Sequence, residues 1–236
     1  MTTQRPTLFD LHDGKPFFRN LPIQRYAVPL RGRTFLIDAL ADAADLLDQP
    51  DFAKRFIEDD VGPYGLELWD SSIMLAEHLL QAEATDVNVA VELGCGLGLV
   101  SIALASFGWK MTATDNEPTA LAFARHNAQL NAVNSIKFET LDWHHPPKER
   151  HYDRVLAADV LYQLVDQTPL IDCFRALLSP TGVAYVADPN RRIADGFETM
   201  ARSSGFDVEV FDAEAARPDA KQTKGRIYRL RLDEGG

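Results

Sequence analysis

The sequence predicts an α/β fold, doubly wound and Rossmann-like, with a seven-stranded and mostly parallel sheet. From residue 88 onward, β-branched and apolar runs alternate with helical patterns, which is typical of parallel strands joined by crossover helices. The last two apolar runs are joined by a short, charged stretch without a helical pattern, so one of them should run antiparallel to the rest. With 236 residues, of which 46% are hydrophobic, the chain is long enough for one such domain and an N-terminal extension.

The expected strands span residues 88–93, 110–115, 136–141, 154–160, 182–188, 207–212 and 225–232. The expected helices span residues 98–107, 117–130, 164–178 and 191–204, and Gly205 should end the last of them. Ahead of the first strand, an apolar stripe at helical spacing predicts a helix to Ala82 with Ser71 as its cap.

The first 60 residues are expected to form an extension to a main domain at residues 61–236. Residues 1–20 are polar with scattered aromatics, which favours a loosely ordered arm. Two short strands should follow between Ile23 and Ile37, with a hairpin turn at Leu30-Arg31-Gly32-Arg33. Asp38 is expected to cap a helix that runs to Leu47, and a second short helix should lie at Phe52 to Glu58.

Composition excludes several classes of partner. A formal charge of −11 opposes binding to nucleic acid and favours a basic or neutral protein, or a small cationic substrate. Cys95 and Cys173 supply neither a disulfide framework nor a metal cluster, and His144-His145 lack a third ligand at zinc spacing. No apolar run reaches the ~18–20 residues that span a bilayer, and no signal peptide is visible. We therefore expect a cytoplasmic protein with no metal and no membrane contact, with a monomer favoured.

The loop after the first strand of the main domain carries glycine at every second position, at Gly94, Gly96 and Gly98, around the small Cys95. Glycines at this density let a backbone approach a ligand closely, and the helix that follows presents free N–H groups there. The spacing differs from the dinucleotide pattern G-x-G-x-x-G, and the lysine of a phosphate-binding loop is missing. The loop therefore predicts a nucleotide-like cofactor without a phosphate clamp.

Polar and aromatic residues stand at the carboxyl ends of the first four strands, where a doubly wound sheet binds its ligands. Asp115, followed by Asn116, can accept both hydroxyls of a ribose, and Glu92 suits a cationic group. Asp142 can accept from an exocyclic amine, and Trp143 offers a stacking face. The fourth strand contributes Ala158 and Asp159. Capping of the following segments is the alternative for Asp115 and Asp142.

The pattern E-x-G-x-G-x-G with a strand-ending aspartate resembles the class I S-adenosylmethionine-dependent methyltransferases. The stretch from Gly65 through Trp69 to Ser72, the Asp142-Trp143 pair and Asp159-Val160-Leu161-Tyr162 are similar to motifs of their family 16, the seven-β-strand protein lysine methyltransferases. That family includes enzymes that act on the electron-transfer flavoprotein β subunit. The resemblance implies S-adenosylmethionine as the cofactor. It assigns Trp69 to the cofactor and assigns Asp159 and Tyr162 to the acceptor amine, which Asp159 would orient. Trp69-Asp70 and Trp143-His144 depart from the family's usual Trp-Pro and Trp-Gly.

Three functions follow from these residues. The first is methylation of lysine side chains in a cytoplasmic protein. The second is methylation of a small amine or heterocycle, and the third is a non-catalytic protein that binds S-adenosylmethionine. The missing prolines at Asp159-Val160-Leu161-Tyr162 argue against the Asp-Pro-Pro-Tyr type of nucleic-acid methyltransferase.

Overall fold

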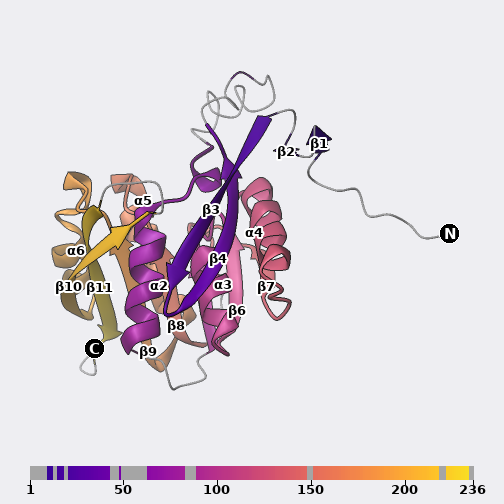
Figure 1. The fold of residues 1–236 in the computed structure, drawn as a ribbon. Coiled ribbons are helices and arrows are strands. Elements are labelled where there is room, and N and C mark those ends of the chain that lie inside the picture. The colour runs from indigo at the N-terminus through magenta and orange to yellow at the C-terminus, as the bar shows by residue number, and fades with distance from the viewer. Residues whose placement is uncertain are drawn as a thin grey trace.

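A twisted seven-stranded sheet forms the centre of the protein in a computed structural model, which describes residues 10–12, 15–18, 21–42, 48, 63–82, 89–147, 151–217 and 222–233 (Figure 1). The strand order is β10-β11-β9-β8-β5-β6-β7. The strands are β5 (Val89–Leu93), β6 (Lys110–Asp115), β7 (Lys137–Thr140), β8 (Tyr152–Ala158), β9 (Leu178–Asp188), β10 (Phe206–Ala216) and β11 (Gln222–Leu232).

The sheet confirms the predicted strand directions. β5 pairs in parallel with β6 on one side and β8 on the other, so the strand order reverses at the border between β5 and β8. β11 pairs antiparallel with both β9 and β10, which makes it the one reversed strand of this sheet. β10 and β11 extend further than expected, because the charged stretch after residue 212 continues the ladder as far as Ala216 paired with Gln222.

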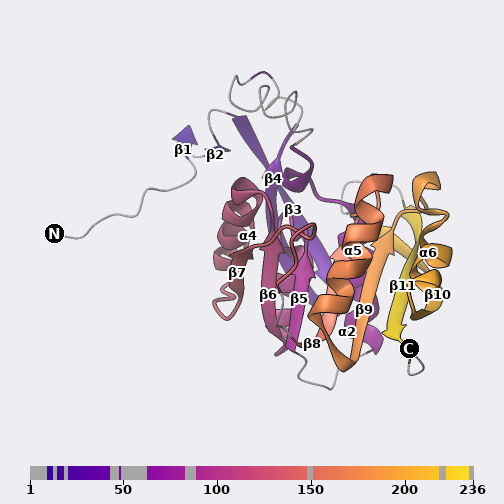
Figure 2. The ribbon, with the colours of Figure 1, turned by 180° about the vertical axis from the view of Figure 1, so that it is seen from behind.

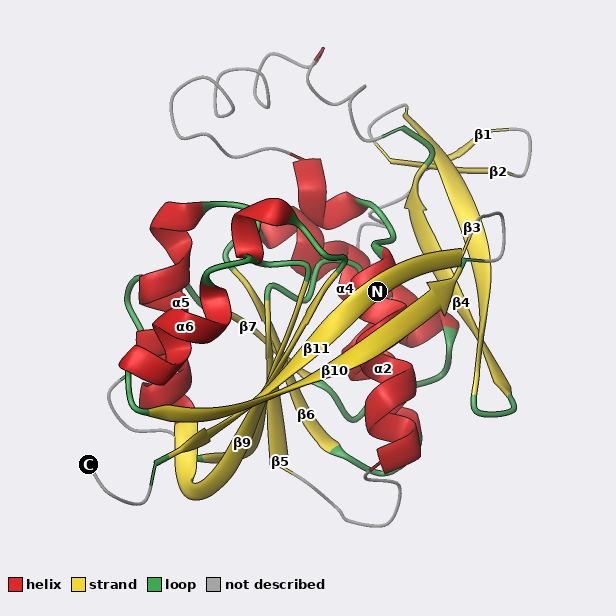
Figure 3. Ribbon diagram, turned by 90° about the vertical axis from the view of Figure 1, so that its left-hand side faces the viewer, coloured by secondary structure: helices red, strands yellow, loops and turns green. Residues whose placement is uncertain are grey.

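Helices cover both faces of the sheet, as Figure 3 shows from the side. One face packs against α2 (Asp70–Ala82), α3 (Leu99–Ser106) and α4 (Pro118–Leu130). The opposite face, in front in Figure 2, packs against α5 (Leu164–Leu177) and α6 (Phe197–Ser203) in a second apolar cluster. These are the layers of a doubly wound α/β fold. Within the described ranges, no helix is long and apolar enough to cross a membrane.

Two predicted helices differ in their boundaries. The helix expected over residues 191–204 is divided into a short 3-10 helix, η3 (Arg192–Ala194), and α6, while Gly205 ends α6 with a φ of 77° as predicted. Ser71 does not cap α2, because the helix already begins at Asp70 and the Ser71 hydroxyl points to another side chain. A 3-10 turn, η2 (Pro63–Leu66), precedes α2.

The N-terminal residues form a four-stranded antiparallel sheet of β1 (Asp10–His12), β2 (Lys15–Phe18), β3 (Leu21–Leu30) and β4 (Arg33–Leu40). The predicted turn between β3 and β4 is confirmed, with positive φ at Arg31 and Gly32. The helix start at Asp38 was wrong: Asp38 lies within β4, where Phe35, Ile37 and Ala39 are buried in the apolar cluster of α2, α3 and α4. The rest of that helix, over 43–47, and the helix at 52–58 lie outside the described residues.

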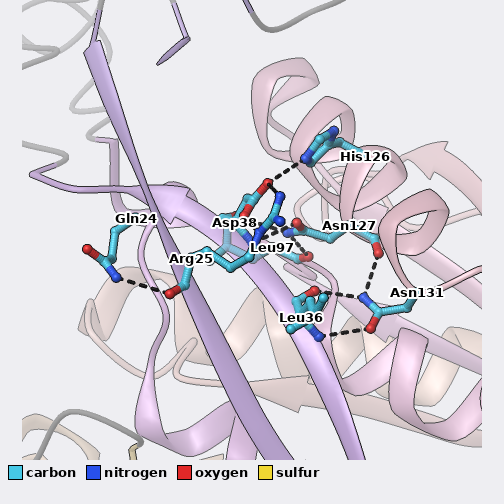
Figure 4. Close-up of polar contacts among 8 residues, drawn as sticks. All are labelled: Gln24, Arg25, Leu36, Asp38, Leu97, His126, Asn127 and Asn131. Atoms are coloured by element: carbon cyan, nitrogen blue, oxygen red, sulfur yellow. Dashed lines mark hydrogen bonds and ion pairs between the residues drawn. The ribbon is translucent and has the colours of Figure 1, made fainter. Parts of the chain in front are cut away.

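A polar cluster fastens β4 to α4 (Figure 4). The buried Asp38 accepts from Arg25 Nε at 2.7 Å and lies 2.8 Å from His126 Nε2. Burial raises the pKa of this carboxyl, but the bonds to Arg25 and His126 outweigh burial and lower it to about 2. Asn127 pairs with the Asp38 backbone through both side-chain atoms and also donates to the Leu97 carbonyl at 3.0 Å. The hairpin β3–β4 is thereby tied to the glycine-rich loop.

Candidate active site

A cavity of about 590 Å³ opens at the carboxyl ends of the parallel strands, beside the strand-order reversal. Every residue that the sequence assigned to the site lines it except Gly98: Trp69, Glu92, Gly94, Cys95, Gly96, Asp115, Asn116, Asp142, Trp143, Ala158, Asp159 and Tyr162. Segments separated by up to a hundred residues thus meet at one place, which is what the ends of neighbouring parallel strands achieve.

Gly98 does not line the cavity; it lies where α3 and α4 pack closely together. It precedes α3 with a φ of 82°, and a Cβ placed there would stand 2.9 Å from the Cβ of Ala124 in α4. A side chain at residue 98 would therefore separate the two helices that flank the loop.

Glu92, which is buried near the end of β5, connects that strand to the helix that follows the glycine-rich loop. Its Oε2 accepts from the backbone N–H of Ser101 at 3.0 Å and from the Ser101 hydroxyl, in the first turn of α3. Burial raises the pKa of Glu92 to about 8 against these two hydrogen bonds. Burial also raises the pKa of the Cys95 thiol well above its usual value, so Cys95 is a poor nucleophile.

Asp115 ends β6 with both carboxylate oxygens on backbone N–H groups. Oδ2 accepts from Gly96 and Oδ1 from Glu117, each at 2.9 Å. Burial raises the pKa of Asp115 to about 6, although these bonds oppose the shift. Each oxygen keeps a further lone pair. Asp115 therefore caps the following segment and can still accept ribose hydroxyls, which combines the two alternatives that the sequence left open.

Asp142 caps its own turn at the edge of the cavity. It lines the cavity, and its carboxylate caps its own turn by accepting from the His144 N–H and from the His145 ring, each at 2.9 Å. Burial raises the pKa of Asp142, but these bonds outweigh it and lower the pKa. Trp143 lies against Gly94, where a Cβ would stand 3.4 Å from Cζ3 of the indole.

The two histidines of this turn bond to carboxylates. His144 Nε2 lies 2.8 Å from Asp166 Oδ1, and His145 bonds to Asp142. Across the part of the chain that the structure describes, no three His, Cys, Asp or Glu side chains are grouped as metal ligands.

Asp159 follows β8 in a left-handed conformation with a φ of 62°, which aspartate tolerates better than most residues. Its Oδ2 accepts from Ser71 Oγ at 2.9 Å, and its Oδ1 accepts from Arg191 Nε at 2.9 Å and from Nη2. Tyr162, 37% exposed, lies beyond it with its ring centroid 6.0 Å from that of Tyr64. The cavity thus has a partly buried ion pair on one wall and exposed aromatic rings at its mouth.

The lysine methyltransferase family matches residues 51–201, more than half of the chain. The chain belongs to this family. Among its relatives, EEF1A lysine methyltransferase 3 of Mus musculus is 30% identical over 177 residues, which cover 71% of this chain and 72% of the relative. Protein-lysine methyltransferase METTL21E of Mus musculus is 33% identical over 62% of this chain and 65% of the relative. Other curated relatives are matched over only 31%, 40% and 58% of their own length.

Solved methyltransferase structures share this fold. The glycopeptide N-methyltransferase MtfA, crystallised with S-adenosylmethionine, superposes with a TM-score of 0.57 at 14% identity, over 69% of this chain and 94% of MtfA. Family and fold together confirm a class I S-adenosylmethionine-dependent methyltransferase architecture, as the motifs predicted.

The lining fits S-adenosylmethionine in its chemistry. Asp115 can accept from the ribose hydroxyls next to the Gly96 N–H, and the Trp143 ring offers a face for the adenine. Glu92 also lines the cavity, where its carboxyl group could accept from the cofactor's amino group. These residues could hold the cofactor, whose methyl group would be transferred in the same cavity as Asp159.

Sequence reasoning missed several residues of the cavity. They are Tyr64, Gly65, Glu67, Leu68, Ser72, Leu97, Leu99, Glu117, His144, Val160, Gln163 and Asp166. Arg191 was not missed: the stretch from Asp188 to Arg192 follows an expected strand, which predicts either a place at the same rim or an Asp-Pro turn, and Arg191 lines the cavity. Tyr64 in η2 has no local pattern that marks it as part of a site.

Proposed function

We propose that this chain transfers a methyl group from S-adenosylmethionine to the side-chain amine of lysine in a cytoplasmic protein. The observation that carries the proposal is the position of Asp159 and Tyr162 in the same cavity as Glu92, Asp115 and Trp143. Membership of the lysine methyltransferase family supports lysine as the acceptor.

The residues act mainly by positioning. S-adenosylmethionine, when bound, supplies a methyl group on a cationic sulfur. Asp159 would accept a hydrogen bond from the acceptor amine and align its lone pair, and Tyr162 with Tyr64 would surround the lysine side chain at the mouth. Correct alignment of two reactants contributes about 7–11 kcal/mol to a displacement of this kind. The amine attacks only in its neutral form, so the site must favour loss of the proton that lysine ordinarily carries at pH 7.

The mouth favours a protein over a small amine. Tyr64, Tyr162, Leu164 and Val165 are 46%, 37%, 60% and 73% exposed, and Leu164 and Val165 begin α5 between residues that line the cavity. A small amine would not reach Leu164 and Val165, whereas the protein surface around a target lysine would cover them. We further propose that residues 61–236 carry this activity and that the N-terminal residues support it.

The first test incubates the protein with methyl-labelled S-adenosylmethionine and a cell lysate. A labelled protein whose label lies on lysine supports the proposal. Label in small molecules alone favours the small-amine alternative, and tight cofactor binding without any transfer favours a binding protein.

Asp159→Asn should abolish transfer and leave the cofactor affinity within about threefold, because asparagine also tolerates the left-handed conformation. Asp153→Asn, at the opposite end of β8, is the matched control. Retained transfer in Asp159→Asn contradicts the role of this carboxylate.

A double change of Leu164 and Val165 to serine should raise KM for the protein acceptor at least fivefold and leave cofactor affinity unaltered. Val210→Ser, which changes another exposed apolar residue, on β10, should alter neither quantity. If the KM of the double variant is unchanged, the exposed apolar residues at the mouth do not contact the acceptor and no longer favour a protein over a small amine.

A further inference from the structure

Both carboxylate oxygens of Asp159 are already engaged. Oδ2 accepts from Ser71 and Oδ1 accepts from two nitrogens of Arg191, and the carboxylate side chain is only 5% exposed. An acceptor amine that enters the cavity therefore meets an ion pair and not an isolated carboxylate.

Arg191 is held from several sides. Its backbone N–H donates to Asp188 Oδ1 at 2.9 Å, and its carbonyl accepts from Arg226 Nη2 at 3.1 Å. Its guanidinium lies 5.4 Å from the centre of the Trp69 ring while it bonds to Asp159. With its backbone anchored and its side chain between Trp69 and Asp159, Arg191 is built to stay paired.

The pair changes the charge that an amine experiences. A lone carboxylate stabilises the ammonium form, which cannot attack. Arg191 is the one arginine or lysine among the described residues that line the cavity. Two unit charges about 6 Å apart interact by about 3 kcal/mol at an effective dielectric constant of about 20, which corresponds to about two pH units.

Other charged or titratable groups surround the pair on every side. Asp188 and Arg226 lie on the sheet side, Tyr64 and Tyr162 at the mouth, and Glu67 and Glu92 line the rest of the cavity. Asp115, Glu117, Asp142 and the His144–Asp166 pair complete the charged lining. All of them remain when Arg191 alone is changed, so a difference between variant and wild type reports Arg191.

We propose that Arg191 is a positioning residue that stays paired with Asp159 during methyl transfer and keeps the acceptor amine deprotonated while Asp159 orients it. The inference rests on the proposed function. The amine first loses one proton to water. Its lone pair then forms the N–C bond as the C–S bond breaks, the bonding electron pair goes to sulfur, and the positive charge passes to the methylated nitrogen.

The test is the pH dependence of kcat for lysine methylation by Arg191→Gln, with Arg191→Lys as the conservative variant and Arg192→Gln as the control, because kcat reports ionisations in the enzyme–substrate complex. Arg192 is exposed and does not line the cavity, so its loss removes the same charge elsewhere. In Arg191→Gln the acidic limb should move up by about one to two pH units, and the rate at pH 7 should fall at least tenfold and recover at higher pH. Arg191→Lys and Arg192→Gln should follow the wild type.

The inference is overturned if the acidic limb of Arg191→Gln shifts no more than that of Arg192→Gln, or if its rate falls by the same factor at every pH. Neither result would contradict the lysine activity of the wild type. Should Arg191→Gln fail to fold, as judged by circular dichroism and by S-adenosylhomocysteine affinity, Arg191→Met replaces it.

Binding provides a readout without turnover. With S-adenosylhomocysteine present, butylammonium should bind Arg191→Gln at least tenfold more tightly than the wild type at pH 7, because Asp159 is no longer neutralised. Equal binding to both proteins, or to neither, overturns the inference even if no lysine substrate exists. A wild type that methylates no lysine defeats the proposed function instead.

Discussion

Asn127 is the residue whose replacement should most clearly separate the fold of the hairpin from the chemistry of the cavity. Its buried amide pairs with the N–H and C=O of Asp38 and with the C=O of Leu97, at 2.9–3.1 Å. Asn127→Leu conserves the volume approximately and leaves these three buried backbone groups without the amide. An unmade hydrogen bond at a buried group costs about 1–3 kcal/mol. We therefore expect the free energy of unfolding to fall by about 3–5 kcal/mol.

Urea unfolding followed by circular dichroism measures this loss, and titration calorimetry with S-adenosylhomocysteine measures the second effect. Because Leu97 belongs to the glycine-rich loop, Asn127→Leu should also weaken cofactor binding at least threefold. Asn131→Leu is the matched control, since Asn131, the residue that follows α4, pairs with the Leu36 backbone but is only half-buried and does not touch the loop. It should cost less than 2 kcal/mol and leave binding unaltered. If the free energy of unfolding of Asn127→Leu lies within 1 kcal/mol of that of the wild type, the reasoning from unpaired buried groups is refuted.

Three further predictions concern single residues. Gly98→Ala should lower the free energy of unfolding by about 3 kcal/mol in urea titrations, from left-handed strain and contact with Ala124; an unchanged midpoint would contradict the packing role. The lowered pKa of Asp38 contributes up to about 2 kcal/mol of stability, which is present above pH ~4 and is lost as the pH falls toward about 2. In that pH range, the free energy of unfolding of Asp38→Asn should therefore change less with pH than that of the wild type. Calorimetric affinity for S-adenosylhomocysteine should fall as pH drops through about 6, where Asp115 takes up a proton, and Asp115→Asn should lose that dependence.

Much of the parallel sheet could be predicted because its information is local. β5, β6 and β8 are short, mostly buried runs with an acidic residue at or next to their carboxyl ends, and the carboxyl ends of parallel strands must meet at one edge. That rule alone brought Glu92, Asp115, Asp142 and Asp159 to one cavity.

The errors have long-range causes. Asp38 has the sequence signature of a helix cap, but pairing with β3 and burial against α4 hold it in a strand. Ser71 resembles a cap too, and its hydroxyl bonds to a carboxylate 88 residues away. Arg191 and Asp159 are 32 residues apart, and no periodicity indicates that a guanidinium will face a given carboxylate. Neither local propensity nor spacing contains these contacts.

Asn127 bonds both to Asp38 in the N-terminal hairpin and to the Leu97 carbonyl in the loop that lines the cavity. Docking of the hairpin is therefore energetically coupled to the conformation of this loop. Coupling between two sites is reciprocal: whatever steadies the loop must favour the docked hairpin by the same free energy. Occupancy of the cavity should therefore slow amide hydrogen exchange at Leu36 and Asp38, two strand residues that do not line it. The exchange rate of the hairpin is in this way a remote reporter of ligand binding.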